Sequence, residues 1–553
     1  SGTLGQDEAL EALAFGLSMT TDGFNIFVLG PDGSGRMSTV RRMVRARASG
    51  ESTPADWCHV VDFDDPRRPG VLELPPGRGP ELRREMEALM AELRRVVPEA
   101  LESDEVASRR MDLVTERARK AEDAVEACRT ELREDPHVAV ITGGEGFTVV
   151  PARGGEPIDE DAFRALPAEH RQEIQEHLTL ARERLASLQR QIHQLRRETS
   201  AEVGRFHQEV ARSVVRPRLA ALKESYGDVP SVVRHLDRME EDILHNAMRL
   251  AERHESDGNP LLEELGEGDF DRRYGVNVLV THAPGSGAPV VEESNPTLKN
   301  VFGQVEGRVR FGVMVTDFTR IVAGAAQRAN GGYLILEARE VLSRPFVWNA
   351  LKRALRSGEL RPGDAGAEMG LPVAETLEPR PLPARLRVIL VGEPEVYYFL
   401  QALDPHFDEL FKVKVDFARE MDRTPDTERG LAGWVSRECR ERDLLPLTAG
   451  AVARLVEEAS RAAEDQCKLS TRLGSLRDRV LEADRVARNG RADRVGAEEL
   501  EAAIRARETR EARPHRELLE LIERGVLAFE PRDSKVGQLH GIALLFGGGV
   551  PFG

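Results

Sequence analysis

Cysteine and long apolar runs are both scarce in this sequence of 553 residues. The four cysteines are far apart and form no C-x-x-C motif or Cys/His cluster: Cys58, Cys128, Cys439 and Cys467. This spacing is typical of a protein in a reducing compartment and does not indicate a structural zinc site. No run of about 18 apolar residues is present, and the N-terminus lacks the basic-then-apolar pattern of a secretory signal. We therefore expect a cytoplasmic protein with no metal site and no membrane segment.

Positive charge is also in deficit, because 95 acidic residues face 78 basic ones and the net charge is −17. No strongly basic block offsets this balance, which argues against nucleic-acid binding. Aromatic residues make up 5% and charged residues 31% of the chain, a composition that fits long exposed helices. A chain of this length is too long for one core, so we expect about two to four domains.

The clearest local pattern is FNIFVLGPDGSGRMST, residues 24–39. A short apolar run, Ile26–Leu29, precedes a loop that is punctuated by glycine, and a basic helix follows. The glycines of the loop are Gly30, Gly33 and Gly35. Strand, glycine-rich loop and helix in this order are typical of a P-loop, where backbone amides and a helix N-terminus bind a phosphate.

Two positions of this P-loop depart from the motif G-x-x-x-x-G-K-[S/T]. Lysine would contact the phosphates and serine or threonine would hold magnesium, but Arg36 and Met37 stand there. Arginine keeps the charge in a planar fork, whereas a thioether is not the hard oxygen ligand that magnesium prefers. Ser38 comes one position late and would face about 100° away on a helix. The pattern predicts the scaffold of a nucleotide site without two of its chemical groups.

Two charged segments between residues 82 and 254 carry unbroken heptads. The first seam consists of Met111, Val114, Ala118, Ala121, Val125, Cys128 and Leu132. The second consists of Ile174, Leu178, Ala181, Leu185, Leu188, Ile192 and Leu195. Their equal lengths predict an antiparallel coiled-coil hairpin. The segment between them, 138–151, alternates apolar residues around glycines and predicts a small β-hairpin at the tip.

The flanking segments alternate between strands and helices. Strands are expected at 57–63, 274–281, 333–337 and 386–391, the third of them ending in the acid Glu337, as a Walker B strand does. With the strand before the P-loop, they predict one parallel sheet that a long helical insertion interrupts. Residues 426–508 again read as helical, about the size of a small lid domain.

Together, several segments resemble the AAA+ module of the Lon protease family. They are GQDEALEALAFGL, the P-loop region, NPTLKNVFGQVE, ANGGYLILEAREVL, FVWNALKRALRSGEL and the closing KVGQLHGIALL. The helical insertion and the degenerate nucleotide motifs look most like the ATP-independent C-type branch. The resemblance implies a AAA+-like parallel α/β sheet with a long antiparallel coiled-coil insertion, a small all-α lid domain and the start of an α+β Lon protease domain. The implied boundaries are 1–80 and 259–424 for the α/β domain, 81–258 for the insertion, 425–508 for the lid and 509–553 for the linker and protease start.

The resemblance also implies site residues. Glu337 and Ala338 take the places of the Walker B acidic pair, and alanine cannot act as a base. A polar residue that senses the γ-phosphate is replaced by Glu393, whose charge would repel phosphate. Arg472, with Arg477 as rival, is the expected lid sensor, and no arginine finger is found near residues 411–414.

Val301, Phe302 and Gly303 match the place of the aromatic pore loop that grips substrate in AAA+ translocases, although a core phenylalanine that closes a turn is an equal alternative. The catalytic Ser-Lys dyad is expected downstream of Gly553, since no serine or lysine follows Lys535.

The leading hypothesis is a hexameric, AAA+-like substrate-handling module of a Lon-like serine protease. It would degrade unfolded polypeptides without hydrolysing ATP, would require no cofactor, and its binding of ATP and magnesium is doubtful. One alternative is an ATP-dependent Lon-like motor in which Arg36 replaces the P-loop lysine. The other is an adaptor whose coiled coil binds a partner protein.

Overall fold

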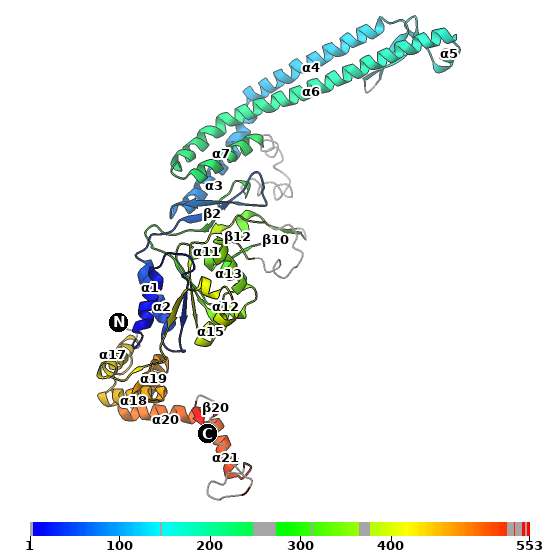
Figure 1. Ribbon diagram of the computed structural model, residues 1–553. Helices are drawn as coiled ribbons and strands as arrows, with labels where there is room; N and C mark the ends of the chain where they lie inside the picture. Colours follow the sequence, from blue (N-terminus) through cyan, green and yellow to red (C-terminus); the bar gives the residue numbers. More distant parts are fainter. Residues whose placement is uncertain are drawn as a thin grey trace.

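A computed structural model describes the chain in several stretches. They are residues 4–143, 146–246, 272–310, 313–363, 377–527, 536, 545–547 and 550–552. Figure 1 shows an α/β body in the middle of the molecule, a long helical arm on one side of it and a small helical unit on the other.

The α/β body is built on a five-stranded parallel sheet with the order β17-β1-β16-β13-β8. The strands are β1 (Ile26–Leu29), β8 (Val290–Glu293), β13 (Tyr333–Glu337), β16 (Arg387–Gly392) and β17 (Val413–Asp416). All four residues of β1 are buried, as expected for a central parallel strand with helices on both faces. The register pairs Ile26 with Ile389 on one side and with Val413 on the other.

Alternate residues of β1 face two different helix layers. Ile26 and Val28 pack in a core with α1 (Asp7–Ser18) and α2 (Arg36–Ala48). Phe27 and Leu29 pack in the opposite core, which includes residues of α10 (Leu298–Phe302), α12 (Ala338–Ser343), α13 (Val347–Ser357) and α15 (Pro394–Leu403). This two-sided burial explains why β1 reads as a continuous apolar run.

Two strands expected in the parallel sheet lie elsewhere, which corrects the sequence interpretation. The strands β2 (Asp56–Val60) and β7 (Asn277–Val280) form a separate antiparallel sheet with β3 (Gly70–Leu74), in the order β3-β2-β7. All five residues of β2 are buried, and a buried apolar strand has the same sequence pattern in either kind of sheet. The edge of the parallel sheet next to β13 is formed instead by β8, a strand that the sequence did not indicate.

This smaller sheet forms the base of the helical arm. Its apolar residues share a core with α3 (Arg78–Leu101), the C-terminal half of α6 (Ala168–Ser225) and α7 (Pro230–His245). Beyond the base, α6 runs beside α4 (Asp104–Arg133), and Figure 1 shows the two long helices extending away from the α/β body. The small β-hairpin predicted at 138–151 is formed by β4 (Val138–Gly143) and β5 (Gly146–Arg153).

The two predicted seams of the arm behave differently. The α6 seam faces inward, with Ile174, Leu178, Ala181 and Leu188 buried. On α4 the end of the seam nearest the base of the arm faces solvent instead, because Met111 is 64% and Val114 is 43% exposed. A straight helix of 3.6 residues per turn drifts away from a strict heptad. At this level Arg117 turns toward α6, where it pairs with Glu202 at 2.8 Å.

The small helical unit contains α17 (Pro425–Glu441), α18 (Ala449–Ala463), α19 (Leu473–Asn489) and α20 (Ala497–Glu511) around one apolar core. It is followed by α21 (Arg513–Glu523) and a short antiparallel pair, β20 (Leu545–Gly547) and β21 (Val550–Phe552). Most of the segment predicted to begin a protease domain lies outside the described residues. Among the described helices, none has the length and apolar character needed to cross a membrane.

Candidate functional site: a P-loop closed by its own side chains

The predicted P-loop connects the end of β1 to the start of α2. Gly30 approaches Phe417 so closely that a Cβ atom on it would lie 2.5 Å from the Phe417 Cβ. Gly33 and Gly35 adopt positive φ angles of 78° and 82°, a region that glycine enters without steric cost. The three glycines therefore set the path of the loop, as the sequence predicted for its scaffold.

Arg36 folds back into this loop. Its guanidinium donates hydrogen bonds to the Gly30 carbonyl oxygen and to Asp32 Oδ1, the latter at 2.7 Å. Glu393 Oε1 lies 3.9 Å from the same guanidinium. Only 13% of the Arg36 side chain is exposed. The cation that would receive a phosphate is thus engaged by protein groups.

Glu393 comes from the opposite wall of the site. It follows β16 and precedes α15, so the sheet places it beside the P-loop. Besides Arg36, its carboxylate contacts Arg339 at 3.5 Å. Its Oε2 atom is buried and has no hydrogen-bond partner. The residue that the sequence presented as repelling phosphate is here a counter-ion of the P-loop arginine.

These groups line a cavity of 420 Å³. Its wall carries four carboxylates, Asp32, Glu337, Glu340 and Glu393, and three guanidinium groups, Arg36, Arg41 and Arg339, so the acids exceed the bases by one. Arg41 is bound to Glu292, with its Nε 2.6 Å from Oε2, and this hydrogen bond lowers the pKa of Glu292. A surplus of negative charge opposes the entry of a polyanion.

The Walker-type positions provide little of the chemistry of ATP hydrolysis. Met37 packs against the core beneath α2, and Ser38 donates its hydroxyl to the Gly35 carbonyl oxygen at 2.8 Å. Glu337 is exposed at the end of β13, while Ala338 is 1% exposed and has no proton to exchange. Within the described ranges, no group of three or more His, Cys, Asp and Glu side chains is arranged to hold a metal ion. Met37 and Ala338 supply neither the oxygen ligand nor the base of a magnesium–triphosphate site.

The helical unit contacts the P-loop directly. The Gly474 amide donates to the Gly33 carbonyl oxygen at 3.0 Å. Arg472 lies two residues before this contact and is exposed. Arg477 is engaged elsewhere, because it donates two hydrogen bonds to Glu438 at 2.6 and 2.9 Å. Of the two proposed lid arginines, Arg472 is therefore the one with a side chain that faces solvent near the loop.

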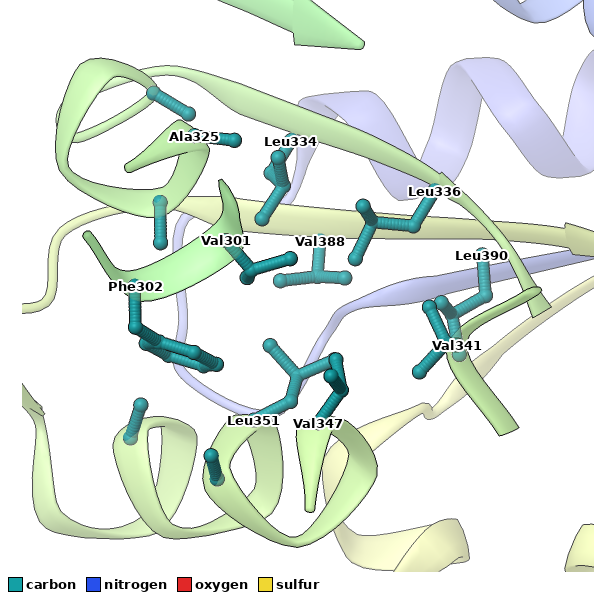
Figure 2. Close-up of a cluster of buried hydrophobic side chains, with 14 of the residues drawn as sticks. Val301, Phe302, Ala325, Leu334, Leu336, Val341, Val347, Leu351, Val388 and Leu390 are labelled. Atoms are coloured by element: carbon teal, nitrogen blue, oxygen red, sulfur yellow. The ribbon is translucent and has the colours of Figure 1, made fainter. Parts of the chain in front are cut away.

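The proposed pore loop is not exposed, which corrects the interpretation of Val301 and Phe302. Val301 is 0% and Phe302 is 3% exposed. Figure 2 shows Val301 beside Val388 and Leu334, and the Phe302 ring in the same apolar cluster. Gly303, with φ 69°, ends α10 in a tight contact where a Cβ atom would lie 2.1 Å from the Val322 carbonyl oxygen. The alternative reading of a core phenylalanine that closes a turn is the correct one.

A five-stranded parallel sheet, a P-loop after its second strand, β1, and a helical unit seated on that loop define a AAA+-type module. Comparisons with family models match residues 286–418 to the LonB-like AAA domain, residues 446–510 to the archaeal LonB AAA+ ATPase LID domain, and residues 56–89 to the Lon-like LonC helical domain. The chain therefore contains a Lon-family AAA+ module.

The individual relatives share low sequence identity with this chain. A putative Lon protease homolog of Escherichia coli (strain K12) is 26% identical over 224 residues, which cover 40% of this chain and 37% of that protein. The aligned part is thus little more than a third of the relative. Among solved structures, NtrX from Brucella abortus aligns with 46% of this chain and 58% of its own, at 15% identity and a TM-score of 0.25.

Proposed function

We propose that this chain is the substrate-handling module of a Lon-like serine protease and that it works without ATP hydrolysis. In this account it is most similar to the C-type branch, assembles as a hexamer in the cytoplasm and delivers unfolded polypeptides to a protease chamber. The observation that carries the proposal is the Arg36 guanidinium, held by the Gly30 carbonyl oxygen, Asp32 and Glu393. A P-loop whose cation is already bound has no free charge to offer a nucleotide.

Two further features support the same proposal. Ala338 stands where a base would polarise the attacking water, and Met37 stands where an oxygen ligand would hold magnesium. The match of residues 56–89 to the LonC helical domain falls on β2, β3 and α3, the base of the arm. Degradation by such a module would be limited to chains that are already unfolded, because no power stroke extracts folded ones.

The test uses the intact protease with casein as an unfolded substrate and a folded protein as its control. Casein turnover should be the same with and without magnesium ATP, and the folded protein should resist in both conditions. Stimulation of casein cleavage by ATP, or degradation of the folded protein with ATP, contradicts the proposal.

A second candidate function is an adaptor whose arm binds a partner protein. The solvent-facing Met111 and Val114 favour it, since they continue a heptad that α6 does not cover. Met111→Asp should then remove a bound partner in a pull-down and leave casein turnover unchanged. A loss of casein turnover in this variant assigns the surface to substrate capture instead.

A further inference from the structure

The carboxylates of Asp32 and Glu393 lie on both sides of the P-loop arginine. Asp32 belongs to the loop itself and is 2.7 Å from an Arg36 nitrogen, whereas Glu393 reaches it from the end of β16 at 3.9 Å. We propose that these two carboxylates are a built-in counter-anion that closes a latent phosphate site. Their charge keeps phosphate-class anions out. This inference rests on the proposed function, in which the loop works without nucleotide.

The parts of an anion site are otherwise present. The loop keeps its three glycines, and α2 begins at Arg36 with its N-terminus toward the loop. A helix N-terminus and a cation favour an anion, and here the anion next to them is supplied by the protein. The cavity of 420 Å³ beside them has the room for a small phosphate compound.

The remaining charges in the cavity show why no external anion is favoured. Arg41 is occupied by Glu292, and Arg339 shares Glu393 with Arg36. Glu337 and Glu340 also line the wall, and the charge of Glu337 acts on Arg41. An entering phosphate would have to displace Asp32 and Glu393 from Arg36 and then remain beside both of them.

The buried Oε2 atom of Glu393 is consistent with this role. It has no hydrogen-bond partner, and an unpaired buried carboxylate oxygen is unfavourable unless a nearby cation compensates it. Arg36 and Arg339 approach the other oxygen of the same carboxylate, Oε1, and so compensate its charge. Glu393 therefore links Arg36 of the P-loop to the end of β16.

The experiment measures binding of inorganic pyrophosphate to the whole chain by isothermal titration calorimetry. The double variant D32N/E393Q should bind pyrophosphate at least tenfold more tightly than the wild type, and adding R36A should abolish the gain. The matched control E337Q/E340Q removes two charges from the same cavity but no partner of Arg36, so it should gain less than threefold. Circular dichroism checks that each variant is folded.

Equal gains in the two double variants, or no gain in D32N/E393Q, overturn the inference. If the double variant does not fold, the isosteric single variant E393Q is used instead. It should retain at least a threefold gain in affinity for pyrophosphate, and a smaller gain counts against the inference. Failure of the proposed function would look different, because magnesium ATP would then bind to the wild type itself. If neither the wild type nor D32N/E393Q binds pyrophosphate, only the inference about the built-in counter-anion is refuted.

Discussion

At the scale of single residues, a buried carboxylate and a buried histidine are expected to make the stability of the fold sensitive to substitution and to acid. Glu438, in the helical unit, is 7% exposed and accepts hydrogen bonds from Arg477 and Arg442. Burial alone would raise the pKa of Glu438, but these two arginines lower it.

Replacing this carboxylate by an amide should leave two arginines without their counter-ion. Breaking a fully buried ion pair costs roughly 3–5 kcal/mol, and the partial exposure of Arg477 and Arg442 brings the expected loss for Glu438→Gln to about 2 kcal/mol. Urea unfolding followed by the fluorescence of Trp434 in α17 measures it. A loss below about 0.5 kcal/mol would mean that the pair contributes no more than a surface ion pair.

His235 in α7 makes the base of the arm sensitive to acid. Burial lowers its pKa to about 4, the nearby Asp62 opposes this shift and Arg238 adds to it. Its ring stacks on Phe63 at 5.5 Å, and its Nε2 atom is buried without a partner. The folded protein therefore holds this imidazole neutral.

The direction of the pH effect follows from proton binding. Between the unfolded pKa of about 6.5 and the folded value, the unfolded chain binds more protons, so stability falls as the pH falls through this window. His235 alone should cost on the order of 3 kcal/mol by pH 4. His235→Gln should flatten the decline in thermal unfolding measured by circular dichroism. An unchanged slope in this variant would assign the acid sensitivity to other groups.

At the scale of elements, α10 provides a direct test of the corrected pore-loop interpretation. Phe302→Ala should destabilise the α/β body by about 3–5 kcal/mol, because it leaves a cavity in the core. The exposed Phe399 of α15, which is 57% accessible, is the matched control, and Phe399→Ala should change stability by about 0.5 kcal/mol or less. Urea unfolding reported by Trp348, in the same core, distinguishes them. A stable Phe302→Ala that loses substrate turnover would restore the pore-loop role.

The two seams of the arm call for a paired comparison. Leu178 on α6 is 6% exposed, whereas Met111 on α4 is 64% exposed. Leu178→Ala should lower the stability of the arm by about 2 kcal/mol or more, while Met111→Ala should stay within about 0.5 kcal/mol. Hydrogen exchange along α4 and α6 measures both changes. Similar effects of the two substitutions would mean that the heptad on α4 is covered along its whole length.

The sequence predicted the positions of strands and helices better than it predicted which of them pack or pair with one another. The apolar run of β1, the glycines after it and the heptads of α6 each follow from local spacing, so the P-loop scaffold and one face of the arm were predictable. Which sheet β2 and β7 join was not, since the same apolar strand fits both sheets. Of the two ion pairs of Arg36, only one could be predicted from the sequence. Asp32 lies four residues before it, a spacing that suggests a pair, but Glu393 is brought there only by the order of the strands.

At the scale of the whole molecule, the α/β body and the helical unit meet at the P-loop, which a nucleotide would normally control. The helical unit is hydrogen-bonded to the P-loop through Gly474 and Gly33, and the end of β16 is tied to it through Glu393 and Arg36. Protein groups alone make both connections. We therefore expect the arrangement of these parts to be the same in the presence and absence of nucleotide.

The most direct test of this account is a calorimetric titration of the chain with ATP and magnesium. We expect no binding in the micromolar range, because Arg36 is already paired with carboxylates and the cavity carries a surplus of negative charge. Micromolar binding that requires magnesium and disappears in Arg36→Ala would contradict it.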